Sequence, residues 1–176
     1  MHMADLIKTL LTLVLSNFPL SCLVLGGLVA LAAMARAPRP LRREAVVEKL
    51  LAWHVFFAIG VSYLYNFVCH VFFGRFTAAY IGWADSPFQF EVGTASLGFA
   101  VVGFVAAFRS FDLRLAAVLG SAVFLLGAAA GHVHQMVTAH NFAPGNAGSI
   151  FYTDIAVPLI GLGLLWVQHR WGRPLV

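Results

Sequence analysis

The chain alternates long apolar segments with short polar loops. Five segments are each apolar over about 20 residues, the length that an α-helix needs to cross a bilayer. They predict membrane-spanning helices over the ranges 6–34, 45–73, 87–108, 113–139 and 150–166. The pattern therefore predicts an all-α integral membrane bundle of five helices, with residues 1–176 forming a single polytopic domain.

Basic residues predict how the bundle is oriented. They gather in the loop after the first segment, in the turn after the third and in the C-terminal tail: Arg36, Arg39, Arg42, Arg43, Lys49, Arg109, Arg114, Arg170 and Arg173. Alternating spans place these three regions on one side, which the positive-inside rule makes cytoplasmic. We therefore expect the N-terminus outside, the C-terminus in the cytoplasm and the chain in the inner (plasma) membrane. Tyr80 and Trp83 are expected in the aromatic belt at the outer face.

The composition fits a lipid bilayer as the main partner and gives no indication of nucleic-acid binding. Hydrophobic residues make up 61% of the chain and charged residues 10%, whereas a typical soluble domain is about 25% charged. The net charge of +4 does not indicate a nucleic-acid surface, because the basic residues lie between apolar runs and not along one polar face. Cys22 and Cys69 are expected at different depths, so we interpret them as packing residues and not as a disulfide.

Ionisable side chains lie near the helix ends that this topology places on the outer side. His70 lies near the end of the second segment, and His132 and His134 lie near the end of the fourth. Glu91 and Asp154 lie inside the starts of the third and fifth segments, each about 7.5 Å deep at 1.5 Å per residue. An ionisable group at membrane depth costs about 2.5–3.5 kcal/mol, so this gathering predicts a buried pocket in the outer leaflet.

Local signals refine the two helix starts. Ser86 is expected as an N-cap, Pro87 as the first helical residue and Gln89 as the capping-box partner. Pro158 follows Asp154 by one turn and has no N–H for the Asp154 carbonyl, so we expect a kink and a free acceptor there.

The sequence leaves open which histidine of the fourth segment belongs to the site. His132 and His134 are two residues apart, about 200° around a helix, so they cannot face the same partner; His132 is slightly preferred. The Pro/Gly/Asn loop after this segment is expected either as a lid over the site or as a tight surface turn. The amide side chains expected to bind or orient a ligand are Asn66, Gln89, Gln135, Asn141 and Asn146.

Three stretches resemble a family of small bacterial and archaeal multi-pass membrane proteins of unknown function. The similar residues are 83–93, 131–136 and 141–148, together with Asp154 and Pro158. The resemblance covers roughly residues 45–165. It implies a multi-pass membrane protein whose outer-side motifs matter, and it implies no substrate and no mechanism.

Several functions fit these residue types, and binding of a metal ion or small ligand is favoured. The expected ligands of zinc, iron, manganese or copper are His70, Glu91, His132, His134 and Asp154. In a membrane metalloenzyme, Glu91 and Asp154 would be the catalytic proton acceptors, although the sequence leaves open whether the protein is an enzyme.

Three alternatives remain open. One is a transporter or channel subunit coupled to ions or protons; it would act on a small hydrophobic substrate or an ion, and a complete path would need a homo-oligomer or a large movement. Another is a b-type haem carrier with His70 and either His132 or His134 as axial ligands. The last is a buried salt network that only fixes helix packing.

Overall fold

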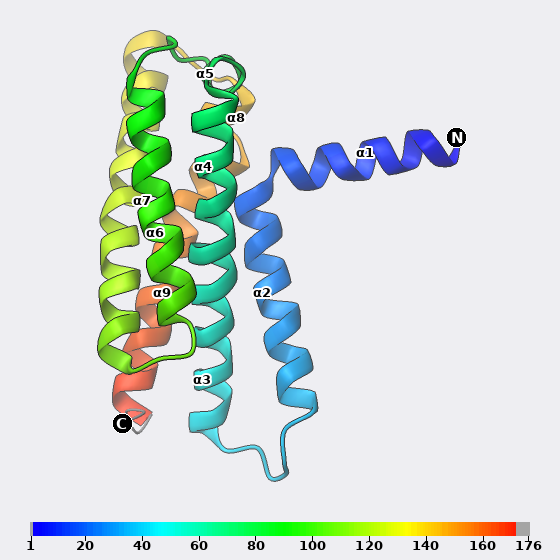
Figure 1. Cartoon of the computed structure of the whole chain (residues 1–176), viewed down its shortest axis with the longest axis vertical. Helices are drawn as coiled ribbons and strands as arrows, with labels where there is room; N and C mark the ends of the chain where they lie inside the picture. The colour runs from blue at the N-terminus through cyan, green and yellow to red at the C-terminus, as the bar shows by residue number, and fades with distance from the viewer. Residues whose placement is uncertain (1, 172–176) are drawn as a thin grey trace.

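In the computed structural model, which describes residues 2–171, the chain is helical and these residues include no β-strand. Five segments of this part of the chain are long and apolar enough to cross a membrane: Phe18–Ala35, Arg43–Phe72, Phe88–Ala106, Phe111–Ala139 and Pro144–Trp171. They run side by side along the long axis of the molecule (Figure 1). The predicted five-helix membrane bundle is therefore confirmed.

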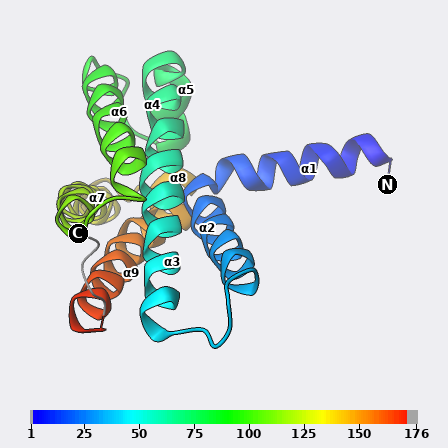
Figure 2. The same cartoon turned by 60° about the horizontal axis from the view of Figure 1, so that its bottom comes forward.

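Further breaks divide these spans into shorter elements. In chain order the elements are α1 (Met3–Ser16), α2 (Phe18–Ala35), α3 (Arg43–His54), the π-helix η1 (Val55–Val61), α4 (Ser62–Phe72), α5 (Gly74–Ile81), α6 (Phe88–Ala106), α7 (Phe111–Ala139), α8 (Pro144–Ala147) and α9 (Ser149–Trp171). In Figures 1 and 2, α2 lies on one side of the second span, while α6 and α7 lie on the other.

The first apolar segment is not the single helix over 6–34 that the sequence predicts. The helix breaks at Asn17, and α1 projects nearly at right angles from the bundle while α2 runs along it (Figure 1). Pro19 gives the physical reason, because it has no N–H and its ring would clash with the Leu15 carbonyl in a continuous helix.

The bundle supplies hydrogen-bond donors for the carbonyls that end α1. Tyr65 of α4 donates to the Leu15 carbonyl at 3.2 Å, and Tyr80 of α5 donates to the Ser16 carbonyl at 3.3 Å. Side chains at the break donate to the two preceding carbonyls: Asn17 to Leu13 and Ser21 to Val14. The last four carbonyls of α1, which a helix leaves without intrahelical partners, are thus all satisfied, and α1 is tied to α4 and α5.

Glycines bring α6 close to the second span. A Cβ atom added to Gly103 would lie 2.7 Å from the backbone nitrogen of Gly60, so this crossing has no room for a side chain. Gly60 belongs to η1, the π-helical stretch in the middle of the span. Small residues at such a crossing let two backbones approach, which is how membrane helices gain packing contacts.

A buried ion pair lies at the end of the bundle opposite to α1. The Arg114 side chain is 0% exposed and donates two hydrogen bonds to the Glu48 carboxylate, at 2.6 and 2.7 Å. Gln168 donates to the same carboxylate at 2.7 Å. Arg114 is therefore neutralised inside the bundle and is not one of the free loop charges that the sequence analysis counted. The predicted orientation of the termini stays a prediction, and Arg173 lies outside the described residues.

Candidate functional site

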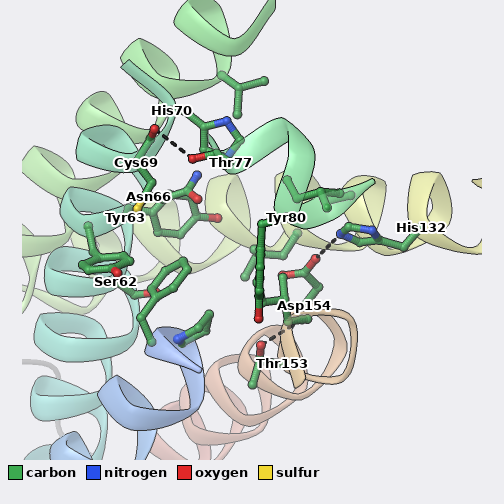
Figure 3. Close-up of a pocket in the computed structure, with 18 of the residues that line it drawn as sticks. Ser62, Tyr63, Asn66, Cys69, His70, Thr77, Tyr80, His132, Thr153 and Asp154 are labelled. Carbon is green, nitrogen blue, oxygen red and sulfur yellow. Dashed lines mark hydrogen bonds and ion pairs between the residues drawn. The ribbon is translucent and has the colours of Figure 1, made fainter. Parts of the chain in front are cut away.

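A cavity of about 1030 Å³ occupies the end of the bundle where α1, α5 and α8 gather. Side chains of α1, α2, α4, α5, α6, α7 and α9 contribute to its walls. Most of the lining is apolar or aromatic. The polar lining includes Asn66, His70, Gln89, His132, Thr153 and Asp154, most of which are labelled in Figure 3.

His132 of α7 and Asp154 of α9 form an ion pair in the cavity wall. His132 Nε2 lies 3.5 Å from Asp154 Oδ2, and the two side chains are only 7% and 8% exposed (Figure 3). The sequence placed both residues near helix ends on the same side of the membrane, and the structure brings them together. This separation is slightly longer than the hydrogen-bond reach of about 2.6–3.2 Å in which an acid and a base exchange a proton, so the contact is an electrostatic pairing.

Asn146 determines which nitrogen of His132 faces Asp154. Its side chain is fully buried, and its amide Nδ2 donates to the backbone carbonyls of His132 at 3.2 Å and Asn141 at 2.9 Å. Its Oδ1 must therefore accept hydrogen bonds, and it receives one from Trp83 Nε1 at 2.9 Å. The same oxygen lies 2.8 Å from His132 Nδ1, so this nitrogen carries a hydrogen and Nε2 is directed at the carboxyl group.

With a hydrogen on Nδ1, one further proton placed on either Nε2 or the carboxyl group makes the His132–Asp154 pair neutral overall. With the proton on the carboxyl group, both side chains are neutral; with the proton on Nε2, they are an imidazolium and a carboxylate. The pair has no net charge in either form. Such a neutral arrangement avoids the high cost of a lone charge at membrane depth.

His70 and Gln89 form a second polar contact, on the α4–α6 side of the cavity. His70 Nδ1 and Gln89 Oε1 are 2.5 Å apart, and an amide oxygen only accepts, so Nδ1 is the donor. The predicted capping box is therefore wrong, because α6 begins at Phe88, no side chain caps it and Gln89 reaches across to α4. Nearby, Asn66 of α4 donates to Ser96 of α6 at 2.9 Å.

The structure does not bring all the predicted site residues together. Glu91 and His134 are exposed and do not line the cavity, so the expected gathering of both with His132 and Asp154 is not formed. Glu91 lies two residues before Gly93, about 200° around α6 from the face that Gly93 buries. Of the two histidines that the sequence left open, His132 is the buried one.

Three predicted amide residues do not line the cavity: Gln135, Asn141 and Asn146. Asn146 holds His132 from behind the wall, and Asn141 fastens the neighbouring loop. Its Nδ2 lies 3.0 Å from the Ile81 carbonyl and 3.1 Å from the Gly82 carbonyl, and its Oδ1 accepts from the Ala143 N–H at 3.0 Å. The Pro/Gly/Asn loop is thus bonded in place against the turn after α5.

Metal and haem binding stay predictions. Among residues 2–171, no group of three or more His, Cys, Asp or Glu side chains lies close enough to hold a metal ion. His70 and His132 both line the cavity, but His132 already has a partner at each ring nitrogen.

Sequence reasoning missed the role of two aromatic residues. Trp83 and Tyr80 were expected in an interfacial belt, yet both line the cavity, where Trp83 binds Asn146 and Tyr80 binds the end of α1. A signal was present, because Trp83 and Asn146 both fall in the stretches that carry the family resemblance. Their pairing could not be read from a sequence separation of 63 residues.

Comparison with known proteins gives one family match. Residues 16–174 match a family of unknown function, DUF6790, which agrees with the resemblance to an uncharacterised membrane family. No curated protein and no solved structure matches the chain. Because the family match spans most of the sequence, this protein belongs to the DUF6790 family, whose function is unknown.

Proposed function

We propose that this protein binds an amphipathic small molecule that enters the cavity from the bilayer. The observation that carries the proposal is the position of Val123, which lines the cavity although its side chain is 75% exposed. Val123 lies about 18 Å along α7 from its first residue, near the middle of a membrane span. A cavity wall exposed at this depth faces hydrocarbon, so the opening admits molecules that are dissolved in the membrane.

The walls suit a molecule with an apolar body and a polar head. Val123, Phe124 and Leu125 supply apolar contacts on α7. His132 lies nine residues beyond Val123, about 13.5 Å further along the same helix. Apolar contacts thus lie toward the middle of the membrane and polar groups toward its surface. This is the orientation that an amphiphile adopts in the surrounding leaflet.

The polar end offers both hydrogen bonds and a transferable proton. His132 and Asp154 can give a proton to the head of the ligand or take one from it, and Asn66 and Thr153 add amide and hydroxyl groups. Ligand pockets commonly combine mostly apolar walls with a few placed polar groups of this kind. Asp154 is therefore the residue that we assign to ligand-linked proton transfer.

Filling the cavity tests this proposal. Gly127 lines the cavity, and a Cβ atom added there would meet nothing within 4 Å, so Gly127→Phe should place a ring in the cavity without a clash at its root. Gly98 has equally open surroundings but does not line the cavity, which makes Gly98→Phe the matched control. The probe is N-phenyl-1-naphthylamine, a neutral apolar fluorophore that accepts energy from tryptophan.

We expect saturable energy transfer from tryptophan to the probe in the wild type, since Trp83 lies in the cavity wall. Gly98→Phe should bind the probe as the wild type does, and Gly127→Phe should bind it at least tenfold more weakly. Equal binding by all three proteins would overturn the proposal.

A further inference from the structure

We propose that the ligand is a lipophilic organic cation, and that it binds in exchange for the proton shared by His132 and Asp154. This inference rests on the proposed function, because it assigns a charge to the head of the same amphiphile. Its evidence is independent, since it comes from the kinds of charged and aromatic groups in the cavity walls.

The walls carry one acidic group and no permanently basic one. Among the described residues that line the cavity, Asp154 is the one carboxylic acid, and neither Lys nor Arg occurs. An anionic head would therefore be buried without a counter-charge, which is strongly unfavourable in an apolar environment. A cationic head would find a carboxylate within the same wall.

Aromatic rings line the same cavity as this carboxylate. They include Phe18, Tyr63, Tyr65, Tyr80, Trp83 and Phe124, which come from four helices and the turn after α5. The faces of such rings attract cations, and this attraction increases when the cation is desolvated. Figure 3 draws Tyr63, Tyr80 and Asp154 among the residues that line this cavity. The walls therefore combine the two groups that recognise an organic cation in an apolar site.

Proton exchange keeps the charge of the site balanced. Before binding, His132 and Asp154 share one proton and have no net charge. When the cation lies beside Asp154, the shared proton leaves to the solvent, the carboxylate pairs with the cation, and His132 stays neutral with its hydrogen on Nδ1. One positive charge enters and one leaves, and no covalent bond changes.

The other titratable groups around Asp154 permit this exchange. Tyr63, Tyr65, Tyr80 and Cys69 also line the cavity, and phenols and thiols are normally uncharged near neutral pH. His70 lies on the α4 side, where its hydrogen-bonded Nδ1 faces Gln89. On the α3 side His54 is buried against Gly161 of α9, and Glu48 and Arg114 neutralise each other at the far end of the bundle.

Two probes of nearly the same shape and opposite charge test the inference. Tetraphenylphosphonium is a permanent lipophilic cation, and tetraphenylborate is its anionic counterpart. Binding of each to the full chain in detergent is measured by calorimetry in two buffers of different ionisation enthalpy, which gives the number of protons released. Asp154→Asn removes the carboxylate, and Glu91→Gln is the control, since Glu91 is exposed and does not line the cavity.

We expect the wild type and Glu91→Gln to bind the cation with release of about one proton at neutral pH, as exchange for a single shared proton requires. Asp154→Asn should bind the cation at least tenfold more weakly, and the anion should not bind detectably. In the wild type, affinity for the cation should rise between pH 5 and pH 8 by up to tenfold per pH unit. Affinity for neutral N-phenyl-1-naphthylamine should not change with pH.

Failure of this inference differs from failure of the proposed function. Equal binding of cation and anion, or cation binding without proton release and without pH dependence, would overturn the cation inference while the neutral probe still binds. If neither the neutral probe nor the cation binds saturably, the proposed function itself is wrong. The pH series needs no variant, so the inference stays testable if Asp154→Asn does not fold.

Discussion

At the scale of single residues, Asn146 connects the loop after α7 to the chemistry of the cavity. Its side chain is fully buried. It is hydrogen-bonded to Trp83 Nε1, to the ring Nδ1 and the backbone carbonyl of His132, and to the Asn141 carbonyl. These contacts hold His132 with its Nε2 toward Asp154. The loop is therefore part of the site, although it contributes no charge to it.

Replacing Asn146 should destabilise the protein through unpaired partners. Asn146→Leu keeps the branched shape, adds the bulk of two methyl groups at a fully buried position, and leaves Trp83 Nε1 and the His132 carbonyl without the bonds that they now make. Because an unsatisfied buried polar group costs about 1–3 kcal/mol, we expect a loss of about 2 kcal/mol or more in the free energy of unfolding. Thermal unfolding in detergent measures it, and Gln135→Leu on the same part of α7 is the control. Equal unfolding midpoints of the two variants would contradict this role of Asn146.

Arg114 gives a second prediction at this scale. Arg114→Met leaves the Glu48 carboxylate, which is 30% exposed, without its bidentate partner, and loss of hydrogen bonds to a charged group costs about 1.5–3 kcal/mol. We therefore expect the free energy of unfolding to fall by about this amount, and we expect Arg109→Met, at an exposed position, to change it little. A small effect of Arg114→Met would show that the ion pair does not stabilise the bundle.

Some residue positions could be predicted from topology, and others could not. His132 and Asp154 meet because alternating spans place their helix ends on the same side. Glu91 was misplaced although a signal was present: the buried face of α6 follows the small residues Gly93, Ser96, Ala100 and Gly103, and Glu91 is out of phase with them. The Glu48–Arg114 pair joins residues 66 positions apart, so no local pattern indicates it.

At the scale of elements, α1 shows how side chains can support a break in an apolar segment. Tyr65 and Tyr80 donate from other helices to its last two carbonyls, and Ser149 of α9 donates to its C-cap, Asn17. Replacing both tyrosines with Phe removes the hydroxyl groups and keeps the rings. We expect amide hydrogen exchange in α1 to become at least several-fold faster, with exchange in α7 unchanged, because the freed carbonyls then depend on solvent or strained geometry. Unchanged exchange in α1 would show that the tyrosines do not anchor it.

The ends of helices could be predicted where an apolar run gives way to polar or charged residues. The second, third and fourth spans begin and end within two residues of their predicted ranges, because apolar runs meet charged or loop residues there. The fifth span, predicted over 150–166, extends over Pro144–Trp171, since the helix continues past the apolar run through His169 and Arg170.

Irregularities of the helical backbone inside an apolar run were harder to predict. The break at Asn17 had a signal in Pro19, which the prediction of one helix over 6–34 did not use. The π-helical stretch at Val55–Val61 lies where Gly60 meets Gly103 of α6, and the apolar run there contains no local signal for it.

At the scale of the whole molecule, the bundle encloses polar groups at both ends and a cavity at one. The sequence predicted that polar groups would gather there around a buried pocket. It could not predict the volume of the cavity or its mostly apolar walls, because these depend on how side chains of several helices pack together. Val123 lines the cavity and is also exposed on the outside of the bundle. This position is the reason for proposing a ligand that enters from the bilayer.

The most direct test of this account is the affinity of N-phenyl-1-naphthylamine for Gly127→Phe relative to Gly98→Phe, measured by energy transfer from tryptophan. The account predicts saturable binding that is at least tenfold weaker in Gly127→Phe, because only that ring enters the cavity. Equal affinities of two folded variants would contradict it, since the probe would then bind somewhere other than the cavity.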